Sequence, residues 1–119
     1  MIELSYQLPW PPTVNHIYAR TKRGGVMLNP KAKAYREEVI GLVGKGHTAF
    51  AGGIAVRIEV YMPDRRKRDL DNLGKAVLDS LTHAGVWNDD SQIGCLLFIK
   101  RGIESPGRVI VTVKPHEMG

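Results

Sequence analysis

Apolar and polar residues alternate near the start of the chain and again in its middle. A period of two residues is typical of a strand with one buried face. The sequence therefore predicts strands over residues 2–8 and 54–62, each followed by a proline that ends it. The apolar residues in these two alternations are Ile2, Leu4, Tyr6 and Leu8, then Ile54, Val56, Ile58 and Val60.

Two other segments repeat their apolar residues at offsets of three and four, which indicates amphipathic helices. The clearer one predicts a helix over residues 70–84, with Gly85 as its C-terminal stop. The other begins where Asn29 precedes Pro30, a typical helix start, and predicts a helix over about 30–45.

Two apolar segments near the C-terminus predict the remaining strands. They cover residues 93–100 and 109–114, and the Gly102–Gly107 connection predicts a hairpin between them. Residues 13–29 show no sustained period and predict a loop or a basic hairpin arm. The order β-α-β-α-β-β predicts one α+β domain over residues 1–119, with two helices and a mixed or antiparallel sheet.

Composition agrees with one ordinary globular domain. The chain has 119 residues, 43% apolar and 24% charged, which argues against wholesale disorder or a fibrous repeat. Its single cysteine, Cys95, lies in an apolar run, so we expect a buried thiol in a reducing compartment. No membrane-length apolar stretch or signal-peptide layout is visible, so we expect a soluble, cytoplasmic protein.

Basic residues outnumber acidic ones and are unevenly distributed. The chain carries 17 Lys and Arg against 12 Asp and Glu, a net charge of +5, which favours polyanionic partners. Six bases and one acid fall within residues 1–36, and a second basic group forms an unbroken run. We therefore take these residues as candidate DNA-phosphate contacts: Lys22, Arg23, Arg65, Arg66, Lys67 and Arg68.

Two acids flank Leu70 at the start of the second predicted helix. Asp69 and Asp71 can converge there, and Lys75 lies four residues beyond Asp71 on the same helix face. Neighbouring carboxylates repel unless a cation lies between them, and hard oxygen ligands suit Mg²⁺. The same residues also suit an ordinary structural role, in which Asp69 caps the helix and Asp71 pairs with Lys75.

A second acidic group, Asn88–Ser91, follows the helix stop and includes Asp89 and Asp90. Alone, this group is typical of a turn. Four acids beside the densest basic run, however, supply the parts for metal-assisted attack on a phosphodiester, with carboxylates for the ions and cations for the backbone.

Three blocks of sequence resemble the RusA-type Holliday junction resolvases, in that family's order and spacing. The first is Leu8–Pro12 with Asn15 and Tyr18. The second is Met62–Arg66 and Arg68–Leu73 with Lys75. The third is Ala84–Trp87 with Asp89 and Asp90. The resemblance spans nearly the whole chain, although residues 19–29 and 102–108 match no family pattern.

The resemblance implies specific roles for the acids and for Lys75. Asp69, Asp71 and Asp90 would be the essential aspartates and metal ligands, Lys75 the catalytic lysine, and Arg68 a residue of junction handling. Asp89 is a weaker candidate. The family is homodimeric, uses Mg²⁺ or Mn²⁺, and introduces paired symmetric nicks in four-way DNA junctions. Such an enzyme would act in recombination and repair at the nucleoid, often with a phage origin.

Chain length tests whether Asp90 can join the other two aspartates. A helix over 70–84 rises roughly 21 Å, and the six residues from Ala84 to Asp90 span at most about 20 Å. The return is feasible if residues 86–90 run back along the helix, guided by packing of Trp87. Otherwise Asp90 must come from the partner subunit. We expect the same subunit, and we expect Trp87, like Trp10, to be a packing residue.

Three other functions stay open on the sequence alone. A non-catalytic nucleic-acid-binding module would use the acids only as caps, and it would not nick a four-way junction in the presence of magnesium. A phage assembly protein would not bind DNA in a salt-sensitive manner. A nuclease for flaps or replication forks would share the metal chemistry, and only a panel of branched substrates separates it.

Overall fold

The computed structural model describes residues 3–12 and 18–117. Six strands, two α-helices and one 3-10 turn follow one another along the chain. They are β1 (Leu4–Pro9), β2 (Tyr18–Arg20), β3 (Val26–Leu28), α1 (Pro30–Val43), β4 (Ile54–Met62), α2 (Leu70–His83), η1 (Asp90–Gln92), β5 (Ile93–Ile103) and β6 (Arg108–Pro115). The predicted α+β class and the six predicted elements are confirmed. The short hairpin β2–β3 confirms the basic hairpin arm, one of the two alternatives predicted for the segment before α1.

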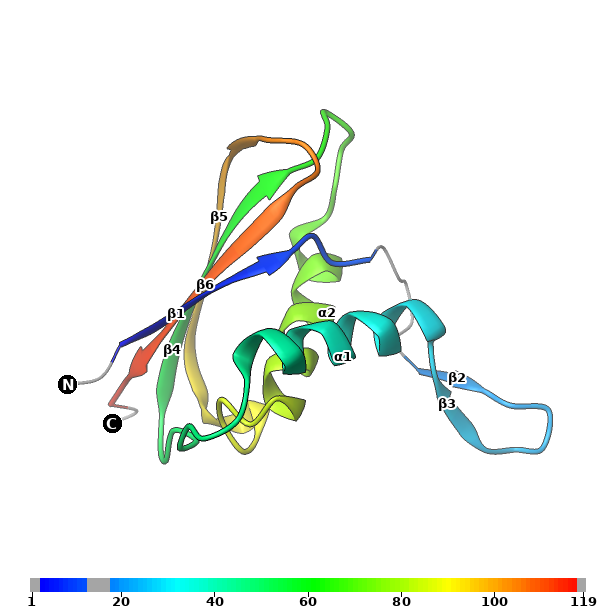
Figure 1. Cartoon of the computed structure of the whole chain (residues 1–119), viewed down its shortest axis with the longest axis horizontal. Helices are drawn as coiled ribbons and strands as arrows, with labels where there is room; N and C mark the ends of the chain where they lie inside the picture. The colour runs from blue at the N-terminus through cyan, green and yellow to red at the C-terminus, as the bar shows by residue number, and fades with distance from the viewer. Residues whose placement is uncertain (1–2, 13–17, 118–119) are drawn as a thin grey trace.

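Four strands form a mixed sheet in the order β1-β6-β4-β5. β6 runs antiparallel to both of its neighbours, whereas β5 runs parallel to β4. Both helices lie on the same side of this sheet (Figure 1). The core fills the space between them, with Val39 of α1, Leu81 of α2 and the inward residues of β4 and β6 fully buried. α2 therefore connects two parallel neighbouring strands and lies across them.

The opposite face of the sheet is covered by no helix of the described residues. Arg57 and Cys95 are exposed on this face, where they line a shallow hollow together with Leu97 and Lys114. The expectation that Cys95 is buried is therefore wrong. An apolar run indicates a buried strand only when both faces of that strand are covered, and β5 lies at the edge of the sheet with one face open.

The predicted hairpin between the last two strands is also wrong. β5 and β6 are separated by β4, which pairs with both of them. Residues 104–107 cross the end of β4, since four residues can span the roughly 10 Å between next-nearest strands. β4 and β6 take the centre of the sheet because their inward valines are fully buried, whereas β5 keeps several exposed apolar residues and takes the edge.

Both helix boundaries follow local signals in the sequence. The Asn29 side chain accepts a hydrogen bond from the Lys31 backbone N–H at 2.9 Å, and Pro30 occupies the first turn of α1. α2 ends at His83 with Ala84 as its C-cap, and the next residue, Gly85, has a φ of 81° in the left-handed region. The Gly85 and Val86 N–H groups bond to the carbonyls of Thr82 and Leu81, which satisfies the last turn. Gly85 therefore fixes the point at which the chain leaves α2.

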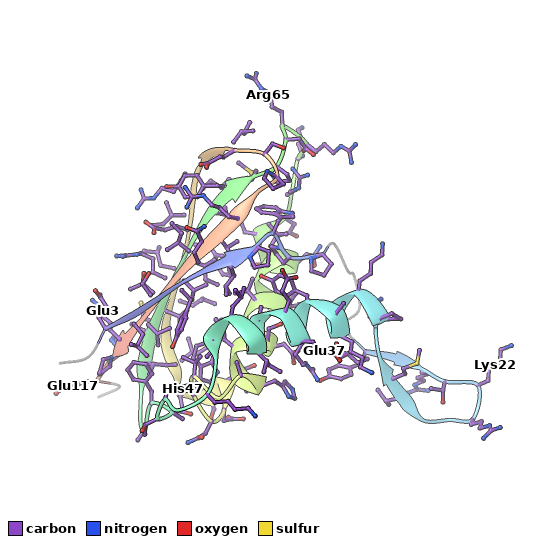
Figure 2. The ribbon with its side chains drawn as sticks, viewed as in Figure 1. Glu3, Lys22, Glu37, His47, Arg65 and Glu117 are labelled. Atoms are coloured by element: carbon purple, nitrogen blue, oxygen red, sulfur yellow. The ribbon has the colours of Figure 1, made fainter. Side chains whose placement is uncertain are left out.

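The β2–β3 hairpin extends from the body of the protein, and Lys22 lies near its tip (Figure 2). We call residues 18–28 the hairpin arm. It forms a separate two-stranded sheet and runs into α1 through Asn29. None of the helices in the described ranges is long and apolar enough to cross a membrane.

Gly107, at the end of the connection between β5 and β6, packs against Pro63 at the start of the loop after β4. Its φ is 92°, and a Cβ at this position would lie 3.0–3.2 Å from atoms of Pro63. We expect Gly107→Ala to lower the free energy of unfolding by about 1–3 kcal/mol, because a side chain is disfavoured there by both backbone conformation and packing. Urea denaturation measures this. The control is Gly102→Ala, since a Cβ there meets no atom within 4 Å; an equal loss in both variants would contradict the explanation.

Candidate active site

The loop between β4 and α2 presents the densest basic run of the protein. Arg65, Arg66 and Lys67 are exposed on it, and Arg65 points away from the body at the end of the molecule (Figure 2). Asp64 stabilises the turn of the loop, because its Oδ1 accepts a hydrogen bond from the Arg66 backbone N–H at 2.9 Å. Residues 65–67, which we call the basic loop, are thus held in a turn with their cationic side chains in solvent.

Arg68 has a different role from its three basic neighbours. Its side chain is only 15% exposed, and its Nη1 lies 2.7 Å from Asp64 Oδ1. The guanidinium also lies over the Trp10 ring, 5.5 Å from the centroid. Hydrogen bonds from Arg68 and then from the Arg66 backbone lower the pKa of Asp64 to about 2. Arg68 therefore ties the basic loop to the body, and Trp10 packs against it.

The first acidic pair lies at the N-terminal end of α2. Asp69 is the N-cap, and its Oδ1 accepts the Asp71 backbone N–H at 3.0 Å, so the structural role weighed for Asp69 is confirmed. Asp71 and Lys75 are exposed on the first turns of the helix. In the described part of the chain, no ion pair within 4 Å joins Asp71 to Lys75. Both side chains are thus available to a ligand at this end of α2.

The second acidic pair lies at the other end of α2. Asp89 caps η1 by accepting the Ser91 backbone N–H at 3.0 Å, and hydrogen bonding by Ser91 lowers the pKa of Asp89. The Asp90 side chain instead turns toward α2, where its Oδ1 lies 2.5 Å from the Thr82 hydroxyl and 3.3 Å from the Trp87 indole nitrogen. The turn interpretation thus holds for Asp89, while Asp90 is left facing the helix.

An open groove of about 480 Å³ runs between α2 and β5 and joins the two acidic ends. Along α2 the eleven residue-to-residue steps from Asp71 to Thr82 rise about 16 Å. Residues 86–90 do not run back along the helix, because Val86 is bonded to Leu81 and to Phe50 near its C-terminal end. The predicted course of residues 86–90 back along the helix toward Asp69 and Asp71 is therefore not observed. The groove is lined by Asp71, Gly74, Lys75, Leu78, Asp79, Asp90, Leu96 and Phe98.

The acidic pair at the start of α2 carries the kind of oxygen donors that the implied metal prefers. Mg²⁺ is commonly held by one or two protein carboxylates, with water and substrate phosphate completing its coordination. Asp69 and Asp71 fit that requirement at the start of α2. Among residues 3–12 and 18–117, however, no group of three His, Cys, Asp or Glu side chains is arranged to hold a metal ion. The described residues thus present two separate acidic pairs rather than one cluster of three metal-ligating side chains.

Gly74 sets the distance between α2 and β5 in the middle of the groove. A Cβ at Gly74 would lie 2.4 Å from Phe98 Cζ, well inside van der Waals contact. Only glycine lets the helix approach the ring this closely. The contact was not predicted, since an isolated glycine in a helical pattern does not by itself reveal its neighbour.

A charged cluster beside the groove was also missed. Arg36 of α1 donates through Nε and Nη2 to Asp79 Oδ2 of α2, at 3.1 and 2.8 Å, and through Nη2 to the Tyr18 hydroxyl at 3.1 Å. The Arg36 and Asp79 side chains are mostly buried. This cluster connects the hairpin arm to both helices. No spacing rule in the sequence relates residues that lie 43 positions apart.

The sequence matches the family model described as endodeoxyribonuclease RusA over residues 9–114. The chain therefore belongs to the RusA endodeoxyribonuclease family. Among its relatives, the crossover junction endodeoxyribonucleases RusA of Shigella sonnei strain Ss046 and Escherichia coli strain K12 are each 41% identical over 117 residues, covering 97% of this chain and 95% of the relative. The corresponding protein of Enterobacteria phage 82 is 43% identical over 115 residues, covering 94% and 92%.

Membership in the RusA family confirms the resemblance drawn from the three sequence blocks. The candidate site residues Asp69, Asp71, Lys75 and Asp90 all lie within the matched range, as do the basic loop and the hairpin arm with Lys22 and Arg23. Asn15, part of the first block, falls outside the described residues.

The Gly74 contact yields a test of how α2 is positioned. Alanine is more favourable than glycine in a helix by about 1 kcal/mol. We nevertheless expect Gly74→Ala to lower the free energy of unfolding by a net ~1–3 kcal/mol and to reduce DNA cleavage, because its Cβ displaces Phe98 or the helix. Thermal or urea unfolding and nicking assays measure the two effects. Adding Phe98→Leu should restore part of both losses.

The matched control is Gly41→Ala, a helical glycine of α1 whose Cβ would meet nothing within 4 Å. It should be neutral or stabilising. If Gly74→Ala behaved like Gly41→Ala, the close approach of α2 and β5 would not be a constraint on the site.

Proposed function

We propose that this RusA family member is a Holliday junction resolvase, a structure-selective endodeoxyribonuclease that introduces paired nicks in four-way DNA junctions during recombination and repair. The observation that carries the proposal is the match to crossover junction endodeoxyribonucleases over 97% of the chain. The acidic ends of α2 and the adjacent basic loop supply residues that suit phosphodiester hydrolysis. Branched DNA is thus the proposed substrate and partner.

The proposed catalytic groups are Asp69, Asp71, Lys75 and Asp90. The three carboxylates would hold Mg²⁺ or, in its place, Mn²⁺. The bound ion would polarise the scissile phosphate and lower the pKa of an attacking water. Lys75, one turn after Asp71, is placed to stabilise negative charge that grows on the phosphate oxygens. The capping contact of Asp69 uses Oδ1 and leaves Oδ2 for a ligand.

The separation of the acidic ends supports a site shared between two subunits. Asp71 and Asp90 lie near opposite ends of a 14-residue helix, so a two-fold axis across the groove would bring Asp90 of the partner subunit toward Asp71. A two-fold dimer also presents two equivalent sites to a substrate that needs two symmetric cuts. We therefore propose a homodimer in which each site combines Asp69, Asp71 and Lys75 with Asp90 of the partner subunit.

The β5 strand is the surface best suited to that dimer. It is an 11-residue edge strand, and Leu96, Leu97 and Ile103 on it are 42–50% exposed. Long edge strands with exposed apolar residues readily pair with another chain. Leu96 also lines the groove that contains both acidic ends, so pairing along β5 would place the partner beside the site.

Two separate groups of exposed basic residues suit the DNA backbone. The basic loop precedes α2 directly, and the hairpin arm carries Lys22 and Arg23, both exposed. Each neutralised phosphate releases condensed counterions and strengthens binding without reading sequence. We propose that Arg65, Arg66 and Lys67 contact phosphates near the cut, that Lys22 and Arg23 contact a more distant part of the junction, and that Arg68 contributes by holding the loop.

Subunit mixing tests both the catalytic residues and the shared site. Asp71→Asn and Asp90→Asn homodimers should each lose nicking by at least 100-fold while binding the junction, because binding rests on the bases. After the two variants are mixed and subunits exchange, a heterodimer with shared sites keeps one intact site. It should therefore nick one strand of a synthetic four-way junction, at about half the wild-type rate per dimer, without completing paired cleavage.

The same mixture gives no nicking if Asp71 and Asp90 act within one subunit, since each heterodimer site then carries a defect. Linear duplex of the same sequence, flaps and forks serve as substrate controls. An Asp71→Asn homodimer that nicks junctions at the wild-type rate would remove Asp71 from the site, and equal cleavage of linear duplex would contradict the proposed specificity.

Salt dependence tests the basic loop. Replacing Arg65 or Lys67 by Gln should reduce the slope of log Kd against log salt concentration by about 1 per residue, because one phosphate contact is lost in each case. Fluorescence anisotropy with a labelled junction measures the slope. The control is Lys114→Gln, which removes an exposed cation on the uncovered sheet face and should leave the slope unchanged. The same decrease in this variant would mean that the basic loop acts only through the net charge of the protein.

A further inference from the structure

We propose that Thr82 and Trp87 are positioning residues that hold one oxygen of Asp90, so that the other oxygen is presented to the divalent cation in a fixed direction. This inference rests on the proposed function, in which Asp90 is a metal ligand. It adds two residues to the site that are not themselves acids or bases. Trp87 was expected only to pack, and Thr82 drew no attention in the sequence.

The hydrogen bonds around Asp90 can be assigned from donor chemistry. The Trp87 indole N–H can only donate, and its nitrogen lies 2.7 Å from Thr82 Oγ1 and 3.3 Å from Asp90 Oδ1. Thr82 Oγ1 therefore accepts from the indole, and its single proton is left for Asp90 Oδ1 at 2.5 Å or the Leu78 carbonyl at 2.9 Å. The shorter distance is that of a charge-assisted O–H···O⁻ bond, which directs the proton to Asp90.

The two donors are themselves fixed by the fold. Trp87 is fully buried and forms an isolated bridge with Phe50. Thr82 lies in the last turn of α2, which Gly85 terminates. The backbone of Asp90 is fixed as well, because Gln92 accepts the backbone N–H groups of Asn88 and Asp89 and donates to the Phe50 and Gly52 carbonyls.

This arrangement has a consequence for cation binding. Both recorded contacts of the Asp90 carboxylate use Oδ1, which leaves Oδ2 for the ion. A hydrogen bond to one oxygen of a carboxylate restricts the direction of the other, and removing such a supporting contact commonly weakens metal affinity by 10–100-fold. Thr82 and Trp87 should thus affect how tightly the cation binds rather than whether DNA binds.

The experiment compares Thr82→Val, which keeps the branched shape but lacks the hydroxyl, with Thr82→Ser, which restores it. Mn²⁺ binding to the homodimer is followed by the loss of the free-ion signal in electron paramagnetic resonance, and cleavage of a four-way junction is measured against Mg²⁺ concentration. We expect Thr82→Val to weaken Mn²⁺ binding about 10–100-fold and to raise the Mg²⁺ concentration for half-maximal cleavage in proportion. Thr82→Ser should recover most of both, and junction binding in EDTA should match the wild type.

A Thr82→Val protein that binds Mn²⁺ as tightly as the wild type would overturn the proposal. Trp87→Phe removes the second donor and keeps a buried ring, so it tests the same oxygen if Thr82→Val does not fold. Asp90→Asn distinguishes failure of this inference from failure of the proposed function on which it rests. If Asp90→Asn keeps full Mn²⁺ affinity and cleavage, the role proposed for Asp90 fails; if it loses both while Thr82→Val and Trp87→Phe keep both, only the positioning role fails.

Discussion

The path of α2 across the sheet governs the position of every candidate catalytic group. β4 and β5 run parallel as neighbours, so the connection between them must return along the full length of the strands, and α2 makes that return. Acids that precede the helix and acids that follow it therefore lie at opposite ends, about 16 Å apart from Asp71 to Thr82 along the axis. The proposed site draws on both ends, and this separation is why a second subunit was proposed to complete it.

Packing keeps this helix in place from two sides. On β5, the absence of a side chain at Gly74 lets Phe98 lie against the helix backbone. On α1, the mostly buried ion pair between Arg36 and Asp79 joins the two helices. Partners in a pair of this kind are costly to separate, because either one alone would be a poorly solvated charge. These two packing contacts thus fix α2 against β5 and α1. A rigid helix of this kind holds the side chain of Asp71 in a constant direction.

Local features of the fold could be predicted from the sequence, and non-local ones could not. The period of apolar residues gives β4 and α2 almost to the residue, and Gly85 ends the helix as expected. Strand order depends on which faces are most buried across the whole sheet, so a short connection after β5 was mistaken for a hairpin turn. Charge and family blocks in the sequence could name the candidate acids, whose roles stay predictions. The separation of these acids could not be predicted, because it depends on where residues 86–90 are bonded.

In the two acidic pairs, a structural role for one aspartate is compatible with the catalytic role proposed for the other. In each pair, one aspartate accepts a backbone N–H at the start of a helical turn, Asp69 for α2 and Asp89 for η1. That contact fixes the backbone that carries the second aspartate, which lies one or two residues later and keeps an oxygen available. A cap next to a proposed metal-binding aspartate restricts the direction of that aspartate, because the backbone of the capped turn has little conformational freedom. A good N-cap beside Asp71 and beside Asp90 is therefore compatible with the proposal that these two carboxylates, together with Asp69, hold the cation.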